Sequence, residues 1–221
     1  MLDVNKNQTA ITTGDKVDTV LLTAGKADKD GKAVTIKDFT THTATKTIVV
    51  GGANDLVITT LTGEGDEVIS ATTHTGKLTI SDFTKNTKVF SGSNDDTFKV
   101  TTGASEALEI TSGAGNDTIV GFTAEKDKIK TSNTAGTDAE GFLNKGTLDK
   151  ATYATLDLAI ASFAAGGANA TTALNAYQFK YDSKDYLLID NGTDGYDAAT
   201  DSVVEIVGLV GTLDAADILN A

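Results

Sequence analysis

The 221-residue chain contains no cysteine, no proline and no tryptophan. Without cysteine it forms no disulfide and offers neither a thiolate nucleophile nor a Cys-ligated zinc site. Without proline, its turns depend on other turn-forming residues such as glycine, asparagine and aspartate. Aromatic residues are also scarce, at 6%, whereas Thr, Ala, Gly, Asp and Val are abundant. This composition favours a repetitive β structure with small side chains and many tight turns.

Positive charge is in short supply as well, because 18 basic residues stand against 31 acidic ones and give a formal net charge of −13. A chain this acidic repels nucleic acid and anionic lipid headgroups, so we expect neither nucleic-acid binding nor membrane insertion. No stretch approaches the length of an apolar membrane span. The first residues lack the basic and apolar segments of a secretory signal peptide. Cations and basic surfaces are the partners that the charge favours.

Two segments of the chain repeat one another. Residues 32–60 and 77–102 each read as a strand, an Asp-Phe-Thr corner, a second strand, a glycine-containing turn with an acidic Asn-Asp pair, and a third strand. Apolar centres recur about every ten residues from Ile48 to Ile129, which predicts short strands, two to a coil of about twenty residues. Hairpins prefer Asn-Gly at the apex, whereas here glycine precedes Asn-Asp. We therefore expect an all-β fold with a parallel β-roll or flattened β-helix.

Five turns that precede apolar runs share one pattern: glycine at the second place, an acidic residue at the sixth and an apolar residue at the eighth. They are TGDKVDTV (13–20), VGGANDLV (50–57), TGEGDEVI (62–69), SGSNDDTF (91–98) and SGAGNDTI (112–119). Their acidic residues are Asp18, Asp55, Glu67, Asp96 and Asp117, with Asp95 beside Asp96.

These acidic turns are candidate calcium ligands. A glycine-rich turn exposes backbone carbonyls, and the adjacent carboxylate can reach the same hollow. Stacked turns can thereby supply the six to eight oxygens that calcium binds. One such turn alone reads equally well as a solvated turn with an Asx hydrogen bond. Copies on opposite edges of a coil cannot share an ion, so we expect only some pairs of turns to bind one.

A loop near the C-terminus is a second candidate calcium site. Residues 190–201 read DNGTDGYDAATD and place Asp190, Asp194, Asp197 and Asp201 at close spacing. The loop is similar to an EF-hand loop in having acids at the first and fifth places. It differs in having glycine at the third place and no glutamate at the twelfth.

The ten-residue pattern stops near residue 130, so we divide the chain into a β-roll over 1–130 and a C-terminal region over 131–221. Apolar side chains and turn signals in the second region predict three elements. These are an amphipathic helix over 147–165, a hairpin over 176–191 and a strand over 202–209. We expect the helix to cap the open end of the coil, whose strand edges and apolar interior would otherwise be exposed.

The turns resemble degenerate copies of the RTX nonapeptide, the glycine-rich calcium repeat of proteins exported by type I secretion, with Ser112–Val120 as the nearest copy. Residues 177–209 look like the C-terminal module of such proteins, among them surface-layer proteins of Gram-negative bacteria. The resemblance implies a β-roll that folds as calcium binds outside the cell, and export by a signal within the uncleaved C-terminal region. The chain departs from the repeat at Lys16, Ala53 and Asn94, which stand where the family has glycine.

We expect a protein that is not an enzyme, because the chain shows no Ser-His-Asp arrangement, phosphate loop or paired histidine ligands. His42 and His74 occupy matching Thr-Thr-His-Thr segments, which predicts a shared structural corner. The resemblance implies a calcium-dependent structural protein of a bacterial surface layer, secreted by the type I apparatus and self-assembling on the cell surface. Its partners would be other copies and lipopolysaccharide or another surface anchor.

Two alternatives remain open at this point. One is the C-terminal secretion and folding module of a larger RTX-type exported enzyme or adhesin. The other is a carbohydrate-binding β-solenoid, which would need an exposed row of aromatic side chains that this sequence hardly provides.

Overall fold

The computed structural model describes residues 2–25, 33–63, 67–83, 87–100, 107–113, 115–130, 141–171, 175–191 and 194–219. This part of the chain is mostly β, with two sheets and one α-helix, α1 (Leu156–Ala161). The prediction of an all-β fold with parallel sheets is confirmed. No helix in the described ranges is long and apolar enough to cross a membrane.

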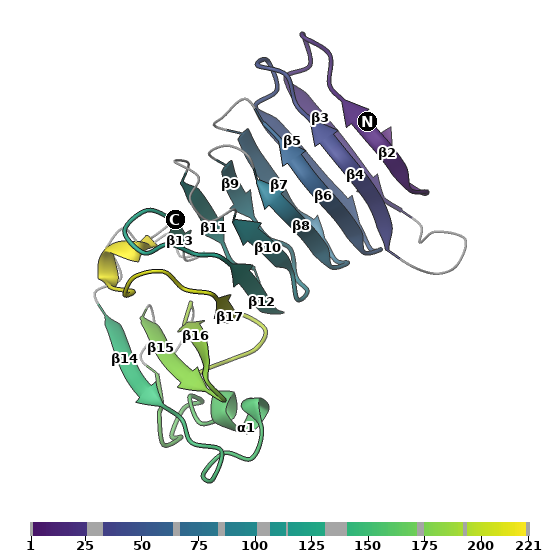
Figure 1. Cartoon of the computed structure of the whole chain (residues 1–221). Coiled ribbons are helices and arrows are strands. Elements are labelled where there is room, and N and C mark those ends of the chain that lie inside the picture. The colour runs from purple at the N-terminus through teal and green to yellow at the C-terminus, as the bar shows by residue number, and fades with distance from the viewer. Residues whose placement is uncertain are drawn as a thin grey trace.

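The strands lie in two sheets, and consecutive strands from β1 to β13 alternate between them, so the chain winds as a solenoid (Figure 1). Sheet A contains, in spatial order, β1 (Leu2–Asp3), β3 (Thr19–Ala24), β5 (Thr47–Gly52), β7 (Glu67–His74), β9 (Thr87–Phe90), β11 (Leu108–Thr111), β13 (Lys128–Lys130) and β18 (Ile218–Leu219). Sheet B contains β14 (Phe142–Thr147), β15 (Ala176–Tyr181), β16 (Lys184–Ile189), β17 (Ser202–Val207), β12 (Gly115–Val120), β10 (Thr97–Val100), β8 (Leu78–Phe83), β6 (Leu56–Thr62), β4 (Val34–Thr40) and β2 (Gln8–Thr12).

Each coil takes about twenty residues, as the spacing of apolar centres predicts. In sheet A, Ile69 pairs with Ile48 and Val89 pairs with Ile69, all in parallel. The coil from β3 to β5 is longer, because Val20 pairs with Ile48. Two parallel strands per coil and stacked coils are the features of a β-roll-like fold.

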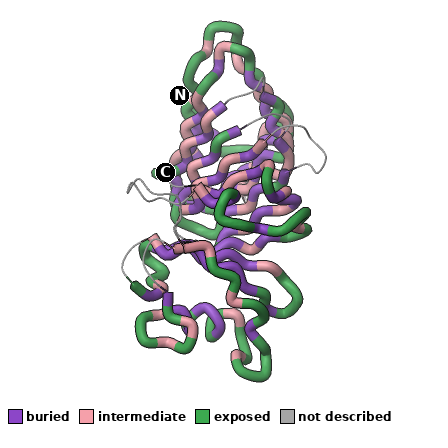
Figure 2. The backbone as a smooth tube through the Cα atoms, turned by 90° about the vertical axis from the view of Figure 1, so that its left-hand side faces the viewer, coloured by how far each residue is buried: buried purple, intermediate pink, exposed green. Residues whose placement is uncertain are grey.

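Inward side chains stack in register and form the core between the sheets. Sheet B contributes one column and sheet A another, all of them at most 1% exposed. The two columns are Ile36, Ile58, Ile80, Phe98 and Ile119, and Ile48, Ile69, Val89, Ile110 and Ile129. Buried and exposed positions alternate along the stacked strands (Figure 2). Burying each large apolar side chain contributes about 1.5–3 kcal/mol, so the repeating pattern itself stabilises the stack.

The C-terminal region extends sheet B beyond the last coil. Strand β17 pairs in parallel with β12 and antiparallel with β16, and β16 pairs antiparallel with β15. The hairpin turns at Asp182 and Ser183, which both have positive φ, 51° and 65°, as a two-residue type I′ turn requires. The predicted hairpin over 176–191 and the strand over 202–209 are therefore confirmed, the latter as Ser202–Val207.

The helix is shorter than the predicted span of 147–165. Thr147 belongs to β14 and the Leu148 amide bonds to the Lys180 carbonyl at 2.8 Å, so the sheet holds the first residues of that span. Thr155 caps the helix, its hydroxyl accepting from the Leu158 amide at 3.3 Å. The β14 ladder therefore competes with helix at the start of the predicted span.

Helix α1 packs on the C-terminal hairpin. Just after it, the Phe163 ring lies 6.2 Å from the ring of Tyr177 and 5.1 Å from that of Phe179, measured between centroids. Ile160 joins the same buried cluster. This second core is distinct from the column between the sheets.

The glycines of the turns allow consecutive coils to approach closely. A Cβ atom at Gly113 would lie 1.7 Å from the backbone oxygen of Gly92 in the preceding coil. That separation is far inside van der Waals contact, so any side chain there would push the coils apart. The second-place glycine is thus a packing requirement at Gly113 and at Gly92, where a Cβ would lie 2.5 Å from the His74 backbone oxygen, but not at Gly14 or Gly51.

We predict that Gly113→Ala lowers the free energy of unfolding by about 2 kcal/mol or more, because a backbone segment must shift to admit the methyl group. Denaturant unfolding followed by far-UV circular dichroism measures the change. The matched control is Gly14→Ala, where the nearest atom to a Cβ is a Val17 methyl at 3.8 Å. Equal effects of the two substitutions would contradict the close approach of the coils.

Candidate functional site

The chain crosses between the sheets along two edges of the solenoid. We call the turns before β6, β8, β10 and β12 the A-to-B edge, and the return turns the B-to-A edge. The A-to-B edge carries the predicted ligands Asp55, Asp95, Asp96 and Asp117. Asp18 and Glu67 lie on the B-to-A edge, before and at the start of sheet A strands. The five aligned turns therefore divide between two edges, and only turns on one edge come together.

Asp96 and Asp117 are neighbours in consecutive coils of the A-to-B edge. Thr97 pairs with Thr118, so the two aspartates just before them lie side by side. Each is 1% exposed, and their side chains continue the buried column that Leu78 occupies in the preceding coil. Two carboxylates thus take the place of apolar side chains in the interior.

Backbone amides of neighbouring turns hold the Asp96 carboxylate. Its Oδ1 accepts from the Leu78 amide at 2.7 Å, and its Oδ2 accepts from the Gly92 amide at 3.1 Å and from the Ser91 hydroxyl. The side chain therefore ties its own turn to the coil before it. Such bonds to a charged acceptor are stronger than bonds between neutral groups.

The Asp117 carboxylate repeats this arrangement one coil later. Its Oδ1 accepts from the Asp96 amide at 2.9 Å, and its Oδ2 accepts from the Ser112 hydroxyl at 2.6 Å. The two aspartates consequently form a ladder in which each carboxylate binds the preceding coil. The serine that opens each turn supplies the matching hydroxyl.

Burial and mutual repulsion disfavour the charged form of these carboxyls. Burial raises the pKa of Asp117 to about 7; the bonds from Ser112 and the Asp96 amide oppose the shift, and the charges of Asp96 and Asp95 add to it. Burial likewise raises the pKa of Asp96, although the surrounding hydrogen bonds lower it in part. The corner thus concentrates negative charge that a proton or a cation would relieve.

Asp55 and Asp95 face solvent on the same edge. Asp55 Oδ1 accepts from the Lys77 amide at 2.9 Å, and Asp95 Oδ1 accepts from the Asn116 amide at 3.0 Å. The ammonium of Lys77 lies 3.6 Å from Asp95 Oδ2. The strand register places Asp55 level with Lys77 and Asp95, so its alignment with Asp96 in the sequence was wrong by one position. Because side chains alternate in a strand, that one position separates outside from inside.

The B-to-A edge holds its two predicted ligands apart. Glu67 is buried and its Oε1 accepts from the Thr41 hydroxyl at 2.8 Å. Asp18 is exposed, and its Oδ2 accepts from the adjacent Thr19 hydroxyl at 3.4 Å. Their coils are separated by the one that carries β5.

Sequence reasoning missed a buried aspartate on the B-to-A edge. Asp127 is 1% exposed, its Oδ1 accepts from the Leu108 amide at 2.9 Å and its Oδ2 from the Thr123 amide at 2.9 Å. This is the same support that Asp96 receives. An acidic residue two places before an inward apolar residue, here Ile129, is the signal that would have found it, with no glycine required.

The matching segments around His42 and His74 predicted a shared structural corner. The structure places the two histidines at different corners. His42 is exposed and follows β4, whereas His74 is fully buried at the end of β7. They lie on opposite edges, so this prediction was wrong. Neither ring nitrogen of His74 has a hydrogen-bond partner in the described part of the chain, and a charge on His74 favours the ionised form of nearby Asp96 and so lowers its pKa.

The C-terminal loop splits its four aspartates into two pairs. Asp190 and Asp201 are each 1% exposed. Asp201 Oδ1 accepts from the Asn191 amide at 2.9 Å and its Oδ2 from the Asp197 amide at 2.8 Å, while Asp190 accepts from the Thr171 hydroxyl. Burial raises the pKa of Asp201, and the charge of Asp190 adds to that effect.

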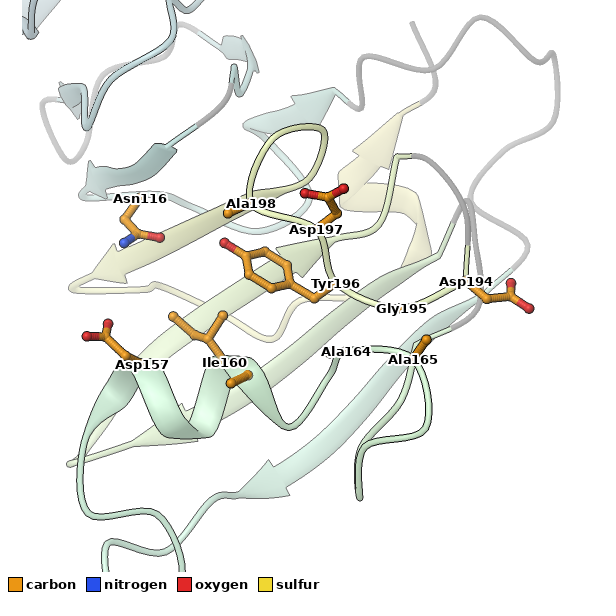
Figure 3. A pocket seen from close by; sticks show the side chains of 11 residues that line it. Asn116, Asp157, Ile160, Ala164, Ala165, Asp194, Gly195, Tyr196, Asp197 and Ala198 are labelled. Carbon is orange, nitrogen blue, oxygen red and sulfur yellow. The ribbon is translucent and has the colours of Figure 1, made fainter.

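Asp194 and Asp197 are exposed and line a pocket of about 650 Å³ between the loop and helix α1 (Figure 3). Asp197 Oδ1 accepts from the Ala199 amide at 2.9 Å. The loop therefore does not direct all four carboxylates at one point.

The side-chain atoms that could bind a metal ion at the Asp96–Asp117 ladder are all oxygens, which is the ligand type that calcium prefers. A carboxylate has about four acceptor positions, and the hydrogen bonds described above leave about three on the pair. Backbone carbonyls and water would have to complete a calcium shell. No three acidic or histidine side chains are grouped as metal ligands in the described ranges.

The comparisons with known proteins identify no family. No protein-family model matches the chain, and neither a curated protein nor a solved structure is significantly similar to it. The function has to be inferred from the residues and their arrangement.

We predict that, in EGTA, the free energy of unfolding falls as pH rises from about 4 to about 7. The folded chain keeps the Asp117 proton until about pH 7, whereas an unfolded aspartate releases it near its usual pKa of 3.8. The folded state therefore binds more protons in this window, and rising pH favours unfolding. Asp117→Asn should remove up to about 1.4 kcal/mol per pH unit of this slope, as measured by urea unfolding at each pH.

The control for this experiment is Asp55→Asn, which changes a carboxyl that also accepts a backbone amide but faces solvent. It should leave the slope as it is in the unmodified protein. Asp96 and Asp201, whose pKa values burial also raises, should leave part of the slope in Asp117→Asn. A slope in Asp117→Asn equal to that of the unmodified protein would contradict the assignment.

Proposed function

We propose that the protein is a structural component of a bacterial surface layer, exported by the type I secretion apparatus and stiffened by calcium outside the cell. The observation that carries the proposal is the stacking of Asp96 and Asp117, two buried carboxylates in consecutive coils. The resemblance of these turns to the RTX repeat and the solenoid of stacked turns support it. A regular solenoid also offers the extended surfaces that an array requires.

Calcium would act on the electrostatic cost of the folded state. The chain carries a formal charge of −13, and Asp96, Asp117 and Asp95 concentrate part of it in one corner. A bound divalent cation would favour the charged carboxylates, and any ligand that binds only the folded state stabilises it. At low calcium the same repulsion keeps the chain loose enough for export.

The C-terminal region would serve export and closure of the coil. The hairpin continues sheet B past β12 and helix α1 packs on the hairpin, which supports a role in covering that end of the solenoid. By resemblance, the same region would hold the secretion signal. Other copies of the chain and lipopolysaccharide or another surface anchor would be its partners.

We predict that calcium raises the melting temperature of the protein and that Asp96→Asn/Asp117→Asn abolishes the increase. At a calcium concentration 100 times the dissociation constant, the stabilisation is about 2.7 kcal/mol. For a chain of this size, this corresponds to an increase of about 5–10 °C. Far-UV circular dichroism during a thermal scan, with calcium or with EGTA, makes the measurement.

The control variant is Asp15→Asn/Asp38→Asn, which removes the same number of charges at an exposed and a half-buried position away from the A-to-B edge. It should keep the response to calcium. Electron microscopy of the same samples tests assembly: ordered sheets on calcium addition support a surface array, whereas a calcium-bound monomer supports a secretion module of a larger protein. Identical melting curves in calcium and EGTA would refute the proposal.

A further inference from the structure

The pocket beside helix α1 has an apolar floor. It is an open hollow bordered by α1 and the residues after it, by residues 194–198, and by Asn116 at the start of β12 (Figure 3). Ile160, Ala161 and Ala164 line it from the helix side. Small side chains there leave the space of about 650 Å³ open, which is within the range of ligand-binding sites.

The loop that forms the other wall is fixed against the helix. The Tyr196 amide bonds to the Phe163 carbonyl at 3.0 Å. Gly195 has φ +95°, and a Cβ there would lie 2.2 Å from the Ala165 backbone nitrogen. Only glycine allows this contact, so the pocket is a built feature of the fold.

The Tyr196 ring stands in the pocket between the two walls, above Ile160 (Figure 3). Burial raises the pKa of its hydroxyl, and the charges of Asp201, Asp197 and Asp157 raise it further. The hydroxyl therefore stays neutral and the ring lies in a negative field. An aromatic face in such a field attracts cations.

Three carboxylates belong to the lining, Asp157 on the helix and Asp194 and Asp197 on the loop, and none of the other described residues that line it is basic. All three residues are exposed. An anionic ligand would be repelled, and a bare metal ion would leave the apolar floor and the ring without a contact. An alkyl chain that ends in an ammonium group fits both parts, its stem on the alanines and its charge beside a carboxylate at the rim.

The chain itself supplies groups of this shape. All 18 of its basic residues are lysines. Lys37 and Lys99 are exposed on sheet B and form no ion pair within the described ranges. Since copies with a charge of −13 repel one another, they associate most readily where a lysine of one meets an acidic hollow of the next.

We propose that this pocket receives a lysine side chain from a second copy of the chain, and so forms one contact of the assembly. The inference rests on the proposed function only in that copies associate. It does not require calcium.

The test uses the full chain and n-butylammonium as a mimic of the lysine side chain, followed by ¹H–¹⁵N correlation spectra. Saturable shifts of the Gly195, Tyr196 and Ala164 amides are expected. Asp157→Asn/Asp197→Asn should weaken binding about tenfold or more, whereas Asp15→Asn/Asp38→Asn should not. Tyr196→Leu keeps the apolar bulk and should weaken binding several-fold through loss of the aromatic face.

Sedimentation velocity of the same proteins tests the occupant. Butylammonium should reduce self-association of the unmodified protein, and Asp157→Asn/Asp197→Asn should associate less than its control, in calcium and in EGTA alike. Absence of shifts at the pocket, shifts that persist in the double variant, or association that neither the probe nor the variant changes would each overturn the proposal. If calcium leaves the melting temperature unchanged but these effects are present, the calcium proposal fails and this one stands.

Discussion

The structure depends on keeping consecutive coils in register, because parallel strands are held only by the coil on either side. Backbone ladders do this within the sheets, but at the edges the chain turns and its amides lose their ladder partners. Side-chain oxygens replace those partners: Asp96 and Asp127 accept amides of the preceding coil in the same way on opposite edges. The acidic turns are therefore structural first, since without them buried amides at the edges would be unsatisfied.

This structural role sets the electrostatic problem of the protein. A carboxylate is a strong acceptor for amides, but a buried one loses hydration. Where two such residues stack, as Asp96 and Asp117 do, repulsion between the two carboxylates adds to the free-energy cost of their lost hydration. Protonation, a cation, or loss of register relieves it, so the same ladder that stabilises the turn makes this corner sensitive to its surroundings.

The repeating strands of the fold could be predicted from the sequence. Which side chains of the edge turns face the core and which face solvent could not. Apolar residues every ten positions predicted the strands, the two sheets and the coil length, because the core requires that period. Asp55 and Asp96 looked equivalent, yet one faces solvent and the other the core, since a shift of one residue reverses a strand's faces. The predicted span of α1 was too long for a related reason. Residues that local propensity assigned to the helix pair instead as part of β14 with β15.

On the A-to-B edge, the buried carboxylates are confined to two consecutive coils, at Asp96 and Asp117. In sheet B their column runs from Leu56 and Leu78 through Asp96 and Asp117 to Val204 of β17. The two apolar coils before them have no charge to neutralise at this position, so the response of this pair to protons or cations is local. It falls where β12 meets β17, the joint between the solenoid and the C-terminal hairpin. Neutralising Asp96 and Asp117 therefore strengthens that joint more than the rest of the stack, which couples the C-terminal region to the state of these two side chains.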